Sequence, residues 1–355
     1  MRLISTAILM ALMGSPLGIC STSSQDAGPL SAQVFADRSV LMPNSSYPLV
    51  ALAADSRGQI YALAWDQVVK LSQRGELIKR VALKKGQGPG EVQNFASVMT
   101  MGMDDNLYVY DGAKFVVYTA DLTFVRNIPV MMAGREFYVD KNGNLHCRKN
   151  DYGSSQPEEF LAKYNPQGKL VGEYIRTPDL AMSMAGGMAI RTPHPYVPTN
   201  LFCLDPRGVM YFLPNTGSQV SRLDPQGAAV PAFKVDAKNI PISREEKTEV
   251  ERIYIGGTSS NAPMNVELRY ADHRPYYRKI LSDENGRFYL VRTESVLIKG
   301  KEATIDIYQA GHDRRELRLG GDPLIVHQGF LYYVVNKDDG VGELTGAIMR
   351  SRVPD

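Results

Sequence analysis

Short apolar runs alternate with polar turn signals along most of the chain. Each run follows a turn rich in Asp, Asn or Gly and carries an aromatic residue or His at a fixed offset. Four copies are close and two are looser: Asp55–Tyr61, Asp140–His146, Asp205–Tyr211, Asp283–Tyr289, Asp104–Tyr108 and His327–Tyr332. Asp can cap the turn with its carboxylate and Gly supplies a positive φ, so the pattern predicts β-hairpins.

A second turn follows several of these copies. It ends in Gly in Lys70–Gly75, Lys163–Gly168 and Arg222–Gly227, and two of the three place Pro before Gln-Gly, as a β-turn requires. Each unit is therefore predicted to be strand, Asp/Gly turn, strand, short link, strand, Gly turn, strand. Six four-stranded units in succession indicate an all-β fold, a six-bladed β-propeller of antiparallel blades over residues 33–355.

The units are longer than a simple blade of about 40–45 residues, and two insertions explain the excess. One lies near residues 177–199 and the other near 237–275. The second holds the one helical pattern, Ser243–Tyr254, in which Ser243 and Glu246 form a capping box. The last unit lacks one strand, and Val34–Met42 is predicted to supply it and so close the ring without an open edge.

The first 20 residues have the pattern of an export signal. Arg2 precedes an apolar run, Leu3–Met13, which is too short to span a bilayer. A buried helix is the alternative. Leu17–Cys20 resembles a bacterial lipobox, although Ile19 departs from it, so Cys20 is a candidate lipidation site and ordinary cleavage is the alternative. Residues 21–32 are predicted to be a linker. The expected location is the periplasm, the outer membrane as a lipoprotein, or the extracellular space.

Composition limits the classes of partner. The 355-residue chain has 40 Lys and Arg against 38 Asp and Glu, a net charge of +2 that does not suggest nucleic-acid binding. Contact with a membrane is expected only through an N-terminal lipid. Three cysteines exclude a disulfide-built scaffold, and Cys147 and Cys203 are expected to be small buried side chains rather than a pair.

The most distinctive stretch is Lys85–Glu91. Its motif consists of Gly86, Gly88, Pro89, Gly90 and Glu91. This turn resembles one found after the first blade in a six-bladed β-propeller family of exported and lipid-anchored bacterial proteins, related in architecture to NHL-repeat propellers. The resemblance implies a fold and a compartment, and it transfers little chemistry. A phosphate-binding loop is the alternative, but such loops open a helix and carry Lys with Ser or Thr. We expect a structural crossing between blades, fixed by hydrogen bonds of Glu91.

No catalytic signature is present in the sequence, so the insertions supply the candidate site. Arg and Tyr together favour recognition of carboxylates, sugars or protein surfaces. The candidate ligand-binding residues are Arg191, His194, Tyr196, Arg269, Tyr270, His273, Arg274, Tyr276 and Tyr277. The alternative is a solvated loop whose tyrosines pack on the neighbouring blade. His146 and His327 are expected to be structural.

Three functions follow from these observations. The first is a non-catalytic binding propeller that recognises a protein, peptide or glycan at one face, without a cofactor. The second is a lactonase-like hydrolase or lyase holding Ca²⁺ with oxygen ligands, for which Glu136, Asn200, Asn265 and Asp272 are candidates. The third is a scaffold of an envelope complex, which an axial channel plugged by apolar side chains would favour.

Overall fold

The structure is a computed structural model. It describes residues 32–354 except for 37–48, 65, 95, 131–135, 152–156, 186–187, 193–195, 257–265, 299–301, 310–313 and 339–343. The proposed signal, Cys20 and the linker up to residue 31 lie outside the described residues. Among the described residues, no helix is long and apolar enough to cross a membrane.

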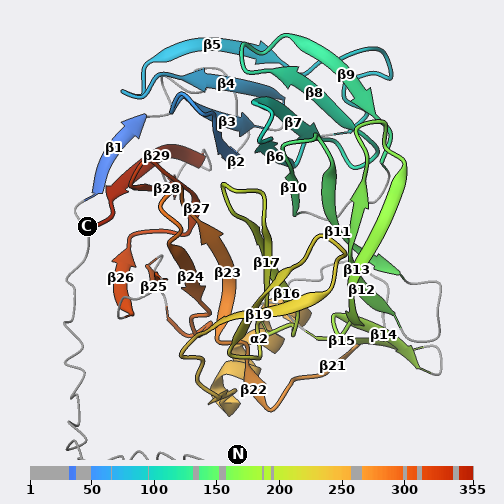
Figure 1. Ribbon diagram of the computed structural model, residues 1–355. Coiled ribbons are helices and arrows are strands. Elements are labelled where there is room, and N and C mark those ends of the chain that lie inside the picture. Colours follow the sequence, from blue (N-terminus) through green and yellow to red (C-terminus); the bar gives the residue numbers. More distant parts are fainter. Residues whose placement is uncertain are drawn as a thin grey trace, which may run out of the picture.

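Six four-stranded antiparallel sheets surround a common axis, which confirms the predicted propeller (Figure 1). We number the blades I to VI from the first inner strand. Blade I contains β2 (Leu49–Ala54), β3 (Ile60–Ala64), β4 (Gln67–Leu71) and β5 (Leu77–Ala82). Blade II contains β6 (Val98–Met101), β7 (Asn106–Tyr110), β8 (Phe115–Thr119) and β9 (Phe124–Ile128). Blade III contains β10 (Phe137–Val139), β11 (Leu145–Asp151), β12 (Glu158–Tyr164) and β13 (Leu170–Pro178).

The remaining blades follow the same order from the axis outwards. Blade IV contains β16 (Asn200–Leu204), β17 (Met210–Pro214), β18 (Gln219–Leu223) and β19 (Ala229–Lys234). Blade V contains β23 (Tyr277–Ser282), β24 (Phe288–Arg292), β25 (Ala303–Tyr308) and β26 (Arg315–Leu319). Blade VI contains β27 (Pro323–His327), β28 (Phe330–Asp338), β29 (Leu344–Arg352) and β1 (Ala32–Ala36).

The two ends of the chain close the ring, as predicted. β1 pairs antiparallel with β29, from Ala32 opposite Ser351 to Ala36 opposite Ile348. The predicted closing strand, Val34–Met42, is misplaced at its start: pairing begins at Ala32, and residues 37–42 lie outside the described part of the chain. The error is one of bounds, because Ala32 and Gln33 lack the apolar pattern that marks a buried strand.

The Asp/Gly turns form as predicted, and they also hold the aligned aromatic residues. In blade I, Asp55 Oδ1 accepts hydrogen bonds from the backbone N–H groups of Arg57 (3.0 Å) and Gln59 (2.8 Å), and Gly58 has φ 76°. The Tyr61 hydroxyl donates to Asp55 Oδ2 at 3.0 Å. The same carboxylate-to-hydroxyl bond joins Asp104 to Tyr108 (2.9 Å) and Asp283 to Tyr289 (2.8 Å).

The apolar core lies between adjacent blades rather than in one centre. Five seams each hold at least ten buried apolar side chains. In the seam between blades III and IV, the described residues contribute four: Leu161, Phe202, Met210 and Phe212. Cys147 and Cys203 are buried and unpaired, as expected. Burial raises the pKa of the Cys147 thiol to about 12, so it remains protonated at neutral pH.

The predicted crossing at Lys85–Glu91 is also present. Glu91 Oε2 accepts a hydrogen bond from the Gly88 N–H at 2.8 Å, and the Gly86 N–H donates to the Val92 carbonyl at 2.9 Å. A Cβ atom on Gly86 would lie 2.0 Å from Glu91 Oε2. The glycine is therefore needed for the close approach of this carboxylate, and the stretch links β5 to β6 without opening a helix.

Candidate functional site

The two faces of the ring differ. In every blade a turn joins the inner strand to the second strand, with an Asp in blades I to V and Gln328 and Gly329 in blade VI. These turns share one face, which we call the turn face. The links from the outer strand of one blade to the inner strand of the next lie on the other face. Both predicted insertions are such links, after β13 and after β19, so we call this the insertion face.

The two insertions join each other on the insertion face. β15 (Met188–Arg191) of the first pairs with β14 (Met182–Ala185) and, in parallel, with β21 (Val266–Leu268) of the second. Within the second, β20 (Ile240–Pro241) pairs with β22 (His273–Arg274) beside helix α2 (Arg244–Gly256). These elements gather beside blades III, IV and V (Figure 1). Segments more than 70 residues apart thus form one platform.

Helix α2 begins with the predicted capping box, which also organises the platform. The Ser243 N–H donates to Glu246 Oε2 (3.0 Å), and the Glu246 N–H donates to Ser243 Oγ (3.1 Å). Glu246 Oε1 accepts hydrogen bonds from the Tyr196 hydroxyl (3.1 Å) and from Arg274 Nη1 (3.0 Å). One carboxylate therefore fixes the helix start to both insertions.

Several candidate binding residues thus serve as packing. Tyr196 is fully buried, its ring lies 6.4 Å from that of Tyr270, and the Tyr270 hydroxyl donates to the Lys247 carbonyl. Tyr276 and Tyr277 are buried and meet edge to face at 4.8 Å. The Tyr277 hydroxyl donates to Asp306 Oδ2 of blade V at 2.8 Å.

The other candidate residues are placed differently. The side chains of Arg269 and His273 are exposed. Arg191 lies on β15, where its side chain is not described, and His194 lies outside the described residues. The structure therefore brings Tyr196, Tyr270 and Arg274 together around Glu246, and it leaves Arg269 and His273 open to solvent beside them.

An axial cavity of about 400 Å³ is lined by all six inner strands. Most of its lining is aliphatic, contributed by residues such as Val50, Leu52 and Ile325. The polar lining residues are Thr100, Glu136, Tyr138, Lys279, Ser282 and His327, of which Glu136, Lys279 and His327 are acidic or basic. The cavity is thus neither a fully apolar plug nor a charged pore in the part of the chain described.

Glu136 stands directly before β10, at the insertion-face end of that strand. Its Oε1 accepts a hydrogen bond from the Tyr138 hydroxyl at 2.6 Å, and its Oε2 lies 3.6 Å from Arg148 Nη1. Burial raises the pKa of Glu136, although Arg148 and Tyr138 act in the opposite direction. The 34% of the Glu136 side chain that is open faces the cavity, where few waters can solvate its charge.

Lys279 enters the same cavity from β23. Its ammonium donates to the Pro323 carbonyl at 2.9 Å. Burial lowers the pKa of Lys279, while Asp322 and Glu136 favour its charged form. Glu136 and Lys279, which carry opposite charges when ionised, therefore share a largely apolar cavity. Burial raises the pKa of Glu136 and lowers that of Lys279, so in each case it favours the neutral form.

A second carboxylate completes the polar network of blade III. Glu159 is buried and paired with Arg148, whose Nε lies 2.7 Å from Glu159 Oε2. Glu159 also accepts hydrogen bonds from the Thr199 hydroxyl (2.9 and 2.8 Å) and the Asn200 N–H (3.1 Å) at the start of blade IV. Arg148 thus bridges two carboxylates and ties blade III to blade IV.

Two of the four candidate calcium ligands already have other partners. Arg148 places a positive charge 3.6 Å from Glu136, and Asn200 donates its amide to Thr177 at 2.8 Å. Asp272 is exposed and Asn265 lies outside the described residues. No group of three or more His, Cys, Asp or Glu that could hold a metal ion occurs among the residues searched, which are the described ones.

Sequence reasoning missed Tyr138, Arg148, Glu159 and Lys279 as parts of a site. Lys279 carries no distinct signal in the sequence, because β23 also contains Arg278 and Ser282. The convergence of the four missed residues depends on the arrangement of blades III, IV and V and leaves no local spacing in the sequence.

Comparisons with known proteins agree with the fold. No protein-family model matches the chain, and no curated protein matches it. The crystal structure of a Bacteroides fragilis protein described as exported is similar, with a TM-score of 0.54 and 12% identity over 92% of this chain and 95% of that chain.

Two enzymes are also among the similar structures. Virginiamycin B lyase from Staphylococcus aureus has a TM-score of 0.46 at 12% identity, over 90% of this chain and 99% of that chain. A gluconolactonase from Xanthomonas campestris has a TM-score of 0.44 at 10% identity, over 87% and 89%. At such identities the likeness concerns the fold alone. The protein is thus a six-bladed β-propeller protein.

Proposed function

We propose that this protein is an exported, non-catalytic binding propeller that recognises a protein, peptide or glycan at its insertion face. The observation that carries the proposal is the parallel pairing of β15 with β21, which joins two insertions into one platform. The platform has its own small core of Tyr196, Ile242 and Val250. Such an ordered surface beside a rigid ring is a usual place for recognition.

The axial cavity offers further polar contacts near the same face, because Glu136 stands at the insertion-face end of β10. Glu136 supplies a hydrogen-bond acceptor and Lys279 a donor. A polar group of the ligand that enters the cavity can therefore donate to Glu136 and accept from Lys279. Arg269 and His273 provide exposed contacts on the platform. Polar groups buried in an apolar cavity favour specificity. A ligand that does not form hydrogen bonds with them binds more weakly, because it leaves these groups buried without partners.

Binding to peptide and glycan arrays tests the proposal. The wild-type chain should bind a defined probe on one array, and this signal should fall at least tenfold in an Arg269→Ala, His273→Ala double variant. Lys114→Ala, in the link between β7 and β8, is the control for a change of surface charge. A wild-type chain that binds neither array, or a signal that the double variant leaves unchanged, would contradict the proposal.

The shifted pKa values of Glu136 and Lys279 favour a second function, acid–base catalysis of a hydrolase or lyase reaction. Catalytic sites commonly contain such pairs in cavities. Hydrolysis of a panel of lactones by the purified chain, compared with Glu136→Gln, tests this function. A rate that EDTA abolishes would favour the calcium-dependent version, and a rate equal to that of buffer would count against catalysis.

Export is the remaining part of the proposal and depends on residues 1–20. Mass spectrometry of the mature N-terminus distinguishes a diacylated Cys20 from an unmodified start after residue 20. Retention of Met1 in a cell-associated soluble protein would contradict export.

A further inference from the structure

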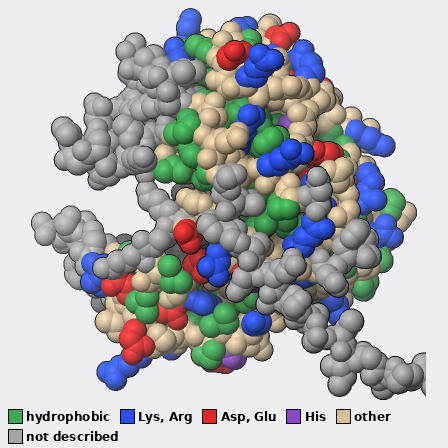
Figure 2. Space-filling model, turned by 90° about the vertical axis from the view of Figure 1, so that its left-hand side faces the viewer, with side chains coloured by type: hydrophobic (Ala, Val, Ile, Leu, Met, Phe, Trp, Pro, Cys, Tyr) green, Lys and Arg blue, Asp and Glu red, His purple; other side chains and the backbone are tan. Residues whose placement is uncertain are grey.

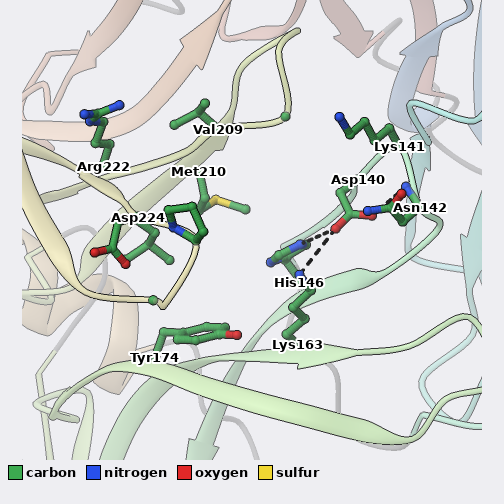
Figure 3. Close-up of a pocket in the computed structure, with 14 residues that line it drawn as sticks. Asp140, Lys141, Asn142, His146, Lys163, Tyr174, Val209, Met210, Arg222 and Asp224 are labelled. Atoms are coloured by element: carbon green, nitrogen blue, oxygen red, sulfur yellow. Dashed lines mark hydrogen bonds and ion pairs between the residues drawn. The ribbon is translucent and has the colours of Figure 1, made fainter.

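The seam between blades III and IV contains a pocket of about 550 Å³ on the turn face, on the side of the ring opposite the insertions. This is the seam with four buried apolar side chains in the described part of the chain. His146 and Lys163 line it from blade III, and Met210 and Arg222 line it from blade IV (Figure 3). Two facing positions of the repeat make different contacts here from their equivalents in blade I.

In blade I the aligned aromatic residue closes the seam to the next blade. The Tyr61 hydroxyl lies 2.6 Å from the Ala120 carbonyl oxygen of blade II and 3.0 Å from Asp55 Oδ2, so its single proton is shared between these two acceptors. Lys70, which lies opposite Tyr61 on β4, forms an ion pair with Asp121 of blade II at 2.8 Å. Both side chains thus cross from one blade to the next.

In blade III the same position is His146, which has no hydroxyl group to reach across. Its Nε2 lies 3.2 Å from Asp140 Oδ2. Lys163, opposite His146 on β12, also turns back to Asp140, at 3.6 Å. Among the described residues neither side chain bonds to blade IV, so the seam stays open as a pocket.

The charges around this pocket favour an anion. Asp140 already accepts hydrogen bonds from two backbone N–H groups, from Asn144 and from His146, and Asp224 caps its own turn. Although burial opposes it, this set of bonds lowers the pKa of Asp140, so its charge is fixed and satisfied. Lys141 and Arg222 make no hydrogen bond or ion pair with a described residue, and Figure 3 shows them on opposite walls.

The pocket also offers an aromatic surface. Tyr174 lies along one side (Figure 3), and a Cβ atom on Gly227 would come within 2.2 Å of its ring, so the ring is seated against this backbone. The side chain of His146 is 9% exposed, with Nε2 beside Asp140 and Nδ1 buried. A ligand in the pocket therefore meets the ring of Tyr174, whereas His146 is held within its own blade.

From these features we infer that the turn-face pocket binds an anionic saccharide. The sugar ring packs on Tyr174, and the carboxylate is held by Arg222 in the positive field to which Lys141 adds. A planar carboxylate suits the guanidinium fork of Arg222. This site is independent of the proposed insertion-face function.

Isothermal titration of the full mature chain with D-glucuronate and a galacturonate disaccharide tests the inference. At least one of the two should bind saturably, with D-glucose and acetate at least tenfold weaker, because the first lacks the anion and the second lacks the ring. If neither acid binds, or if acetate or glucose matches them, the saccharide assignment is overturned.

Three variants locate the site. His146→Tyr, which copies blade I, should abolish binding with an unchanged or higher melting temperature. Arg222 is exposed, so Arg222→Gln leaves the core intact and should weaken binding at least tenfold. This variant tests the site even if His146→Tyr fails to fold. Lys114→Ala, in the link between β7 and β8, should leave glucuronate binding unchanged. Full binding by Arg222→Gln, or loss of binding in Lys114→Ala, would overturn the placement.

Discussion

Phe35 provides the sharpest test of how the ring is closed. It lies on β1, the one strand contributed by the N-terminal side of the chain to blade VI. Its side chain is 5% exposed, and its ring meets Tyr332 edge to face at 5.3 Å. The Arg350 guanidinium lies 5.2 Å from the centre of the same ring. Phe35→Ala removes the main apolar contact that fastens β1 to the sheet.

The expected cost follows from the burial of Phe35. Replacing a buried Phe by Ala costs about 3–5 kcal/mol, and an edge strand that can relax belongs near the lower end, at about 3 kcal/mol. For a chain of this size, about 2 °C is lost per kcal/mol, so the melting temperature should fall by roughly 6 °C. Differential scanning calorimetry measures this change directly.

Val34→Ala is the matched control, because Val34 lies on the same strand and is 64% exposed. It should change the free energy of unfolding by less than about 0.5 kcal/mol. Equal melting temperatures for Phe35→Ala and Val34→Ala would refute the idea that packing of β1 closes the ring. A loss confined to Phe35→Ala would support it.

Three further predictions concern single polar groups. Tyr61→Phe should cost about 1–3 kcal/mol in chemical denaturation, because Asp55 and a backbone carbonyl of blade II lose a buried donor; an unchanged midpoint would contradict this. Glu246→Ala should speed hydrogen exchange in helix α2, whereas Glu249→Ala, which removes an exposed pair, should not; equal rates would show that the capping box is dispensable. Because burial raises the pKa of Glu136 above 4.5, wild-type stability should fall relative to Glu136→Gln as pH rises from 4.5 through that raised pKa; a melting difference that is independent of pH would contradict the assignment.

The blades could be predicted from the sequence because their determinants are local. Asp55 caps a turn within four residues, and Gly58 lies three residues after it. The residues that determine each hairpin are therefore close together in the sequence, and the hairpin can be predicted from them. The closing strand was also predictable, since a ring with one strand missing must find it at the other end of the chain. Its bounds were less certain because Ala32 and Gln33 carry no pattern of their own.

The candidate site was predicted less well, for two physical reasons. Tyr277 follows the second insertion in a row of Arg and Tyr residues, yet it is the first residue of β23 and is buried in a blade. Residue type alone could not separate a binding surface from the start of a strand. Arg148 and Glu159 are eleven residues apart on adjacent strands, and their contacts with Thr199 depend on the angle between two blades.

The space-filling view adds a constraint on partners. On the side shown in Figure 2, Lys and Arg side chains are interspersed with Asp, Glu and apolar ones rather than collected in a single patch. On this side, such a mixture gives no field of a single sign that would gather a polyanion. Selectivity for a ligand on this side then depends on short-range contacts.

The repeat shows how a cavity such as the turn-face pocket can arise. In blade III, as in blade I, an Asp carboxylate caps the turn after the inner strand by accepting hydrogen bonds from two backbone N–H groups. The residue aligned after this turn differs: Tyr61 of blade I also reaches the Ala120 carbonyl of blade II, whereas His146 of blade III bonds to its own Asp140. The capped turn and the contact across the seam are therefore separate features, and a seam can lack that contact while the buried apolar residues of the other five seams hold the ring together.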